Sequence, residues 1–274
     1  MKSYALLSLL FAPLASLALP LNLDGPIEQG ALIRGKTAPG AKVTLDGKVL
    51  KTSPQGDFVL GFGRDDKGPH LLAVALGDDS AHRKLVPKTR QYRLQKVNGV
   101  PERTVNPPEA VQARIRMEAA KVAKVRAETS NRLDFTAPLR WPLTGPITGV
   151  YGSQRIYNGT PKAPHFGVDV AAPTGTQVLA PWAGKVVLAE PDLYFSGGTL
   201  ILDHGHGVSS TFLHLSALDV SPGQEVKAGD PIAKVGATGR ATGPHLDWRL
   251  NWYEVRLDPA LIAPPMPKGE GAPH

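Results

Sequence analysis

The 274-residue chain contains no cysteine. Without cysteine there is no disulfide framework, no thiol nucleophile and no residue to carry a lipoprotein anchor, so stability must come from ordinary hydrophobic cores. Two common hydrolase motifs are missing as well, because the sequence has neither an H-E-x-x-H helix nor a nucleophile elbow. These absences exclude a thermolysin-type arrangement and leave no serine or cysteine nucleophile in a recognised motif.

Aromatic residues are also scarce, at 6% of the chain, although the net charge of +7 makes the protein basic. A protein that binds single-stranded nucleic acid needs aromatic side chains along a basic groove, and the sequence contains no such stripe. Loss of the leader described below removes Lys2 and lowers the net charge by one, to +6. Positive charge favours anionic partners such as cell-wall polymers, and we expect no nucleic-acid partner.

Long apolar runs are absent except at the N-terminus. Lys2 provides a positive start, residues 4–14 form an apolar stretch, and Ser16-Leu17-Ala18 is a small-x-small cleavage site. This pattern is typical of a secretory signal peptide. The apolar run is short for a membrane span and contains Pro13. We therefore predict a cleavable signal peptide over residues 1–18, no stable membrane anchor, and a periplasmic or secreted location.

Short apolar runs alternate with turn signals from residue 19 to residue 100. The runs lie at residues 31–34, 42–45, 57–60 and 71–75, separated by Pro39-Gly40, Asp46-Gly47 and Gln55-Gly56. Asp-Gly is a favoured two-residue hairpin turn, so the spacing predicts antiparallel strands. The region is similar to the immunoglobulin-like β-sandwiches of exported bacterial proteins. It shows no chemical site, and we expect it to position or shield a second domain.

Residues 101–138 are predicted to be a linker that contains a helix. Asn106 is a suitable N-cap, Pro107 occupies N1 and Glu109 occupies N3, which is the pattern of a helix start. The helix should run to about Asn131 and pack lightly on one domain through a narrow stripe of valine and isoleucine. A membrane-surface or inhibitory helix is the alternative, but the stripe lacks large anchors. Residues 264–274 are rich in proline and glycine and predict a disordered tail.

The most informative feature is a set of histidines and aspartates from separate parts of the sequence. His165 and Asp169 stand four residues apart in a segment rich in valine and proline, and His245 and Asp247 stand two apart in a second predicted strand. Alternate residues of a strand share a face, so each pair points one way. His214, in a third apolar run, is a further candidate. Three strands therefore offer an ion the imidazole and carboxylate ligands of a hydrolytic zinc site.

The remaining histidines support weaker expectations. His204 and His206 lie in a predicted turn between two strands, where hydrogen-bonded or exposed imidazoles are the simplest interpretation. His70, His82 and His274 are single residues with no partner nearby in the sequence, and we interpret them as structural or solvated.

The order of these residues and their neighbours resembles the lysostaphin-type, or LytM-like, zinc endopeptidases. The similarity covers about residues 139–263. Its matching positions are Trp141-Pro142, Gly145, Gly149-Val150-Tyr151-Gly152, Arg155, His165, Asp169, Ala172-Pro173-Thr174-Gly175-Thr176-Gln177-Val178, Ala180, Gly184-Lys185-Val186, His214-Leu215-Ser216, Gly236-Ala237-Thr238-Gly239 and Thr242-Gly243-Pro244-His245.

The resemblance implies a mainly β protein whose residues 139–263 form a LytM-type folded antiparallel β-sheet, related to barrel-sandwich hybrids. That family hydrolyses peptide bonds of bacterial peptidoglycan with zinc. Carried over to this chain, His165 and Asp169 are metal ligands and His214 and His245 are catalytic imidazoles. We favour His245 as the general base and His214 as the residue that stabilises the oxyanion. The bond that is cut, in a D-Ala cross-link or a glycine-containing bridge, stays open.

Asp247 departs from the family, which usually has its third zinc ligand, a histidine, at this position. One hypothesis is a His165/Asp169/Asp247 zinc site, because aspartate is an accepted ligand. The second carboxylate would then lower the charge of the centre and make its water less acidic. The other hypothesis is a degenerate, non-catalytic domain that binds cell wall or activates a separate amidase, with a cell-division or amidase partner. We favour the zinc endopeptidase.

Overall fold

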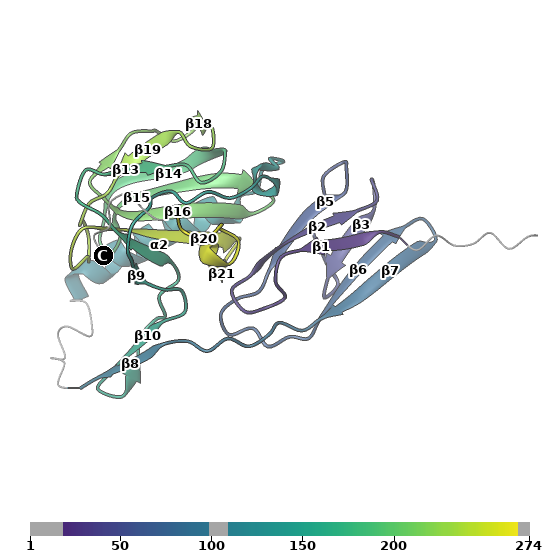
Figure 1. Cartoon of the computed structure of the whole chain (residues 1–274), viewed down its shortest axis with the longest axis horizontal. Helices are drawn as coiled ribbons and strands as arrows, with labels where there is room; N and C mark the ends of the chain where they lie inside the picture. The colour runs from purple at the N-terminus through teal and green to yellow at the C-terminus, as the bar shows by residue number, and fades with distance from the viewer. Residues whose placement is uncertain (1–18, 99–108, 268–274) are drawn as a thin grey trace, which may run out of the picture.

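The computed structural model describes residues 19–98 and 109–267. Two β-rich units follow one another along the chain (Figure 1), and the protein is mainly β as expected. The predicted signal peptide, the N-cap at Asn106 and residues 268–274 of the predicted tail lie outside the described residues. Pro264, at the start of that tail, accepts a hydrogen bond from the indole nitrogen of Trp141 at 2.7 Å.

The first unit consists of two antiparallel sheets. One has the order β1 (Leu21–Asp24), β2 (Leu32–Thr37), β5 (Asp57–Gly61), and the other β4 (Lys48–Val49), β3 (Lys42–Leu45), β6 (His70–Leu76), β7 (Asp79–Leu85). Ile33 and Leu60 from one sheet and Val43 and Leu72 from the other belong to one buried cluster. The sheets therefore enclose a shared core, as a β-sandwich does.

The predicted turn at Asp46-Gly47 joins β3 to β4. Asp46 and Gly47 have φ values of 50° and 77°, and both residues of a type I′ hairpin turn need positive φ. The local sequence therefore fixes this hairpin.

The second unit is built on an eight-stranded sheet. Its order is β18 (Glu225–Val226), β14 (Gly184–Leu193), β15 (Gly197–Gly205), β16 (Val208–Leu215), β20 (His245–Trp252), β12 (Val168–Ala171), β9 (Ile147–Gly149), with β21 (Val255–Leu257) also paired to β20. A smaller sheet has the order β13 (Gln177–Leu179), β19 (Pro231–Lys234), β17 (Ala217–Leu218). Short 3₁₀ turns, η1 (Asp134–Thr136) and η2 (Pro259–Leu261), complete the unit.

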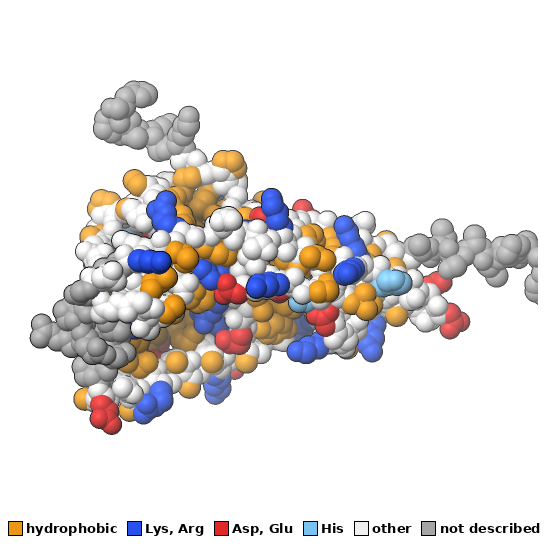
Figure 2. Space-filling model, turned by 90° about the horizontal axis from the view of Figure 1, so that it is seen from below, with side chains coloured by type: hydrophobic (Ala, Val, Ile, Leu, Met, Phe, Trp, Pro, Cys, Tyr) orange, Lys and Arg blue, Asp and Glu red, His pale blue; other side chains and the backbone are white. Residues whose placement is uncertain are grey.

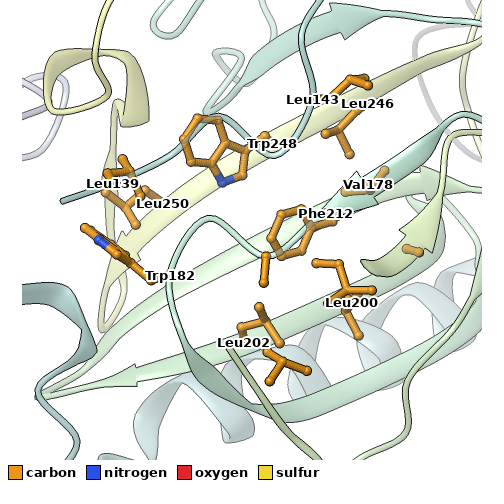
Figure 3. Packing of buried hydrophobic residues seen from close by; sticks show 14 of the residues in the cluster. Leu139, Leu143, Val178, Trp182, Leu200, Leu202, Phe212, Leu246, Trp248 and Leu250 are labelled. Carbon is orange, nitrogen blue, oxygen red and sulfur yellow. The ribbon is translucent and has the colours of Figure 1, made fainter. Parts of the chain in front are cut away.

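The two faces of the large sheet differ in character. One face carries the main core, in which Phe212, Trp248 and Leu250 are fully buried (Figure 3). Side chains alternate along a strand. Thr211, next to Phe212, and Asp247, next to Trp248, therefore lie on the opposite face. That opposite face is where the candidate site lies.

Helix α2 (Glu109–Ala127) packs on the second unit and ends before Asn131, the predicted limit. Lys121 forms an ion pair with Glu190 of β14 at 2.8 Å. Arg126, the buried residue of the helix, donates to the Thr211 hydroxyl at 3.1 Å. The helix therefore covers part of the polar face of the sheet. Within the described residues, no helix is apolar and long enough to cross a membrane.

A third small sheet connects the two units. β8 (Leu94–Val97), at the end of the first unit, runs parallel to β10 (Gln154–Tyr157), which pairs with β11 (Thr160–Pro161). Arg64 donates to the Gly152 carbonyl at 2.9 Å. A Cβ atom at Gly152 would lie 2.0 Å from the ring of Tyr92, so this close packing requires glycine.

Basic side chains are spread along the face of the molecule seen in Figure 2, with acidic and apolar side chains between them. A cleft of about 620 Å³ lies between the units and is lined by Arg34 and Phe58 on one side and Phe135 and Leu139 on the other. None of the candidate site residues lines this cleft.

Candidate metal centre

His165, Asp169 and Asp247 form a group whose candidate ligand atoms all lie within 4.8 Å of one another. Among residues 19–98 and 109–267 it is the one such group. Asp169 on β12 and Asp247 on β20 are paired residues in the antiparallel ladder, so both side chains point to the same face of the sheet. Strand register brings these two carboxylates together.

His165 does not lie in a strand as the sequence suggested, because β12 begins only at Val168. The backbone of His165 is instead held by a neighbouring loop: its N–H donates to Ser153 O at 2.8 Å and its carbonyl accepts from Gly152 N at 2.7 Å. Its Nε2 still lies 3.1 Å from Asp169 Oδ1. The loop, rather than strand periodicity, aims this imidazole at the carboxylates.

The donor set has the property expected of a metal site. His165 Nε2 and Asp169 Oδ1 are both buried, and although they lie 3.1 Å from each other, neither makes a well-formed hydrogen bond within the described structure. Buried polar atoms are rarely left unpaired, and two adjacent ones are explained by a shared cation. Gly149 makes room for this arrangement, since a Cβ there would lie 2.1 Å from Asp169 Oδ2. The residues therefore fit zinc, which accepts imidazole nitrogen and carboxylate oxygen.

Charges within the group shift its pKa values in opposite directions. Burial lowers the pKa of His165, but the neighbouring carboxylates of Asp169 and Asp247 outweigh burial and raise it above its ordinary value. Burial raises the pKa of Asp247, but the guanidinium of Arg249 outweighs this and lowers it. The site thus contains an ionised Asp247 that attracts a cation, and a cation would in turn favour neutral His165.

His214 reaches the site through a β-bulge. Two residues of β16, Leu213 and His214, stand opposite the single residue Thr199 of β15, since Gly198 pairs with Leu215 and Leu200 pairs with Phe212. His214 has a φ of 64°, in the left-handed region. A bulge of this kind turns a side chain away from the regular alternation of a strand.

The imidazoles of His214 and His245 lie side by side, with ring centroids 4.8 Å apart. His214 Nδ1 is 2.8 Å from the Thr238 carbonyl, and His245 Nδ1 is 2.8 Å from the Gly243 carbonyl. A carbonyl only accepts, so each Nδ1 carries the proton and each Nε2 can accept one. Burial also lowers the pKa of His214, which keeps it neutral. His245 Nε2 lies 3.9 Å from Asp169 Oδ1.

Arg249 is the site residue that the sequence analysis missed. Its guanidinium donates two hydrogen bonds to the carboxylate of Asp247, from Nε to Oδ1 at 2.9 Å and from Nη2 to Oδ2 at 2.6 Å. The two residues are two apart on β20 and share a face. Because residues two apart in a strand point to the same face, the sequence could have placed Arg249 beside Asp247 just as it placed His245 there.

Three other histidines, His70, His204 and His206, make structural contacts. His204 and His206 lie at the hairpin between β15 and β16 as expected. Both are buried, and His204 is hydrogen-bonded through both ring nitrogens. His70, interpreted from the sequence as structural or solvated, lies between two carboxylates, 2.7 Å from Asp46 and 2.8 Å from Asp66. Those carboxylates outweigh burial and raise its pKa.

Comparison with known proteins agrees with the geometry. The profile of peptidase family M23 matches residues 163–259. A crystal structure of a Pseudomonas aeruginosa protein assigned to peptidase M23 superposes with a TM-score of 0.66 and 31% identity, covering 86% of this chain and 94% of that one. Both the fold and the sequence of that protein extend over nearly the whole described chain.

Two sequence relatives match part of the chain. Peptidoglycan DD-endopeptidase ShyB of Vibrio cholerae is 38% identical over 105 residues, which is 38% of this chain and 24% of ShyB. Cell division protein DipM of Caulobacter vibrioides is 31% identical over 130 residues, 45% of this chain and 20% of DipM. The chain thus spans a quarter or less of the length of these relatives.

Proposed function

This chain belongs to peptidase family M23, and from that premise we propose that it is an exported zinc endopeptidase that hydrolyses peptide cross-links of bacterial peptidoglycan. The observation that carries the proposal is the pair of buried ligand atoms, His165 Nε2 and Asp169 Oδ1, which lie 3.1 Å apart without a well-formed hydrogen bond. Two imidazoles with available Nε2 atoms lie next to them. The peptidoglycan substrate follows from the DD-endopeptidase relative.

His165, Asp169 and Asp247 would hold the zinc ion. When bound there, zinc would polarise the scissile carbonyl and lower the pKa of the attacking water. His245 accepts the proton of that water at Nε2, since its Nδ1–H is committed to the Gly243 carbonyl. His214, fixed in the same way by Thr238, stabilises the oxyanion after its Nε2 takes up a proton from solvent, and it returns that proton when the oxyanion collapses. The proton held by His245 passes to the leaving amine.

Metal analysis combined with digestion tests this function. Mature protein purified without chelators should contain about one zinc per chain, as a site with three protein ligands binds one ion. It should release peptides from purified peptidoglycan, which mass spectrometry would identify. Chelation should stop the release and added zinc should restore it. Protein that takes up no zinc and releases no peptide would contradict the proposal.

A non-catalytic regulator of cell-wall enzymes is the second candidate, and one contact favours it. Arg249 engages both oxygens of Asp247, so a protein cation already neutralises one predicted ligand. The similarity to a cell division protein is consistent with such a regulator. Binding to peptidoglycan without zinc and without peptide release would support this candidate over the first.

Export is tested separately. If residues 1–18 are a signal peptide, protein recovered from the periplasm or medium should begin near Leu19 by N-terminal sequencing. An intact Met1 in protein found only in the cytoplasm would contradict export.

A further inference from the structure

The contact between Asp247 and Arg249 is unusual for a metal ligand because it is bidentate and largely buried. Asp247 is 2% exposed, and the Arg249 side chain is 24% exposed. Fork-like Arg–carboxylate pairs are charge-assisted and fix the orientation of both groups. Within this pair, the carboxylate of Asp247 has little freedom to rotate.

The backbone of the metal-binding segment is shaped around this pair. A Cβ atom at Gly167 would lie 2.4 Å from Asp247 Oδ1 and 2.8 Å from Cγ of Arg249. Gly167 stands between the two ligands His165 and Asp169. The loop that carries the first ligands therefore packs directly on the Asp247–Arg249 pair.

The pair also changes the charge of the site. A ligand set of two neutral imidazoles and one carboxylate has a charge of minus one. His165, Asp169 and Asp247 together have a charge of minus two. The guanidinium of Arg249, paired with Asp247, returns the total to minus one. The negative charge of the Asp247 carboxylate and the positive charge of Arg249 therefore cancel.

We infer that Arg249 is a positioning residue that turns Asp247 into a charge-compensated metal ligand: it holds the carboxylate in one orientation and offsets its negative charge. The inference rests on the proposed zinc site. Arg249 and Asp247 then act as one unit that takes the place of a neutral histidine. The expectation that a second carboxylate makes the centre less positive no longer applies, because the compensating charge is part of the site.

Two substitutions of Arg249 separate orientation from charge. Arg249→Lys keeps the positive charge but loses the planar fork, whereas Arg249→Met loses both. Removing the charge makes the site more negative, so Arg249→Met should bind zinc about tenfold more tightly in a chelator competition. A less positive centre acidifies its water less, so the acid limb of the pH–rate profile should move up by about one pH unit.

Arg249→Lys should leave the acid limb near its wild-type position. Arg116→Met, which removes an exposed cation of α2, is the matched control and should change neither zinc affinity nor the pH profile. A purely structural arginine would lower the unfolding temperature of Arg249→Met without moving either measurement.

A double-mutant cycle tests whether the two residues form a unit. Asp247→His alone leaves Arg249 next to the metal without its carboxylate. Asp247→His/Arg249→Met should therefore bind zinc about a hundredfold more tightly than Asp247→His. This gain is larger than in the wild-type background, where losing the orientation of the Asp247 carboxylate offsets part of the effect of removing the charge. The pair Arg116→Met and Asp247→His/Arg116→Met gives the non-interacting reference, because Arg116 is on the exposed side of a helix.

The outcomes distinguish this inference from the proposed function. If the wild-type protein binds zinc but Arg249→Met matches Arg249→Lys in both affinity and pH profile, the inference is wrong and the enzyme proposal stands. Additive behaviour in the cycle would also overturn it. If the wild-type protein binds no zinc at all, the proposed function fails first, and the inference fails with it.

Discussion

The hairpin of β15 and β16 carries histidines at both ends, and the two ends use imidazole differently. At the turn, both nitrogens of His204 are hydrogen-bonded, Nδ1 to the Ala183 carbonyl at 2.7 Å and Nε2 to the Ser210 hydroxyl at 2.8 Å. At the opposite end, His214 is bonded through Nδ1 alone, to Thr238. Both ring nitrogens of His204 are thus hydrogen-bonded, whereas Nε2 of His214 is left available for chemistry.

This difference separates a structural histidine from a chemical one better than sequence spacing does. His204-Gly205-His206 looks more like a ligand motif than the isolated His214 does. Burial lowers the pKa of His204 to about 4, so it stays neutral and inert near neutral pH. A histidine that fixes one nitrogen on a carbonyl and leaves the other free is oriented for proton transfer.

Loss of a proposed zinc ligand beside His214 should have the largest effect. His165→Ala or Asp169→Ala removes one of the two unpaired buried ligand atoms, so we expect zinc to be lost and hydrolysis to fall by roughly 10³-fold or more. Zinc content and peptide release from peptidoglycan measure both effects. His82→Ala, at an exposed position of β7, is the control. Normal zinc content in the ligand variants would refute the assignment.

Loss of a catalytic imidazole should separate metal binding from turnover. His245→Ala and His214→Ala leave the three ligands in place, so we expect much of the zinc to remain while turnover falls by about 10²-fold. Single-turnover rates at known zinc occupancy check this. Full activity in either variant would show that the available Nε2 atom is not used.

Asp247→Asn should produce a smaller, graded change. The amide keeps the shape of the carboxylate but loses its charge and most of its strength as a ligand, so zinc affinity should fall by roughly tenfold. Competition with a chromophoric chelator measures the affinity. An unchanged dissociation constant would remove Asp247 from the ligand set.

The buried histidine at the turn, His204, should make the stability of the protein depend on pH. The pKa of His204 is about 4 in the folded protein, against an ordinary value of 6.5 for histidine. The unfolded state therefore binds more protons between these pH values, and stability falls as pH drops below 6.5. At pH 5 the loss should be about 2 kcal/mol. Urea unfolding at pH 7 and pH 5 should show a smaller difference for His204→Asn than for the wild type. Equal differences would contradict the prediction.

Much of the second unit follows from local sequence. The predicted turn at His204 and His206, with a strand on either side, became the hairpin of β15 and β16, and the predicted strand of His245 and Asp247 became β20. Alternation also placed His245 and Asp247 on one face. It could not supply register, which is what sets Asp169 opposite Asp247. Register depends on pairing between distant segments, and a single sequence does not contain that information.

Two features of the site have no local signal. The bulge at His214 places a non-glycine residue in the left-handed region, which propensity alone disfavours. The loop that holds His165 depends on backbone hydrogen bonds to Gly152 and Ser153. In both cases tertiary contacts override the strand pattern, and the result is a side chain aimed into the site.

The pairing of β8 with β10 means that the boundary along the chain and the boundary in space do not coincide. β8 belongs to the first unit by sequence, yet it forms one edge of the small sheet that flanks the second. A fragment cut to begin at residue 109 would leave β10 with an open edge, and open strand edges recruit other chains. The second unit in isolation would thus carry an aggregation hazard that the intact chain covers with its own strand.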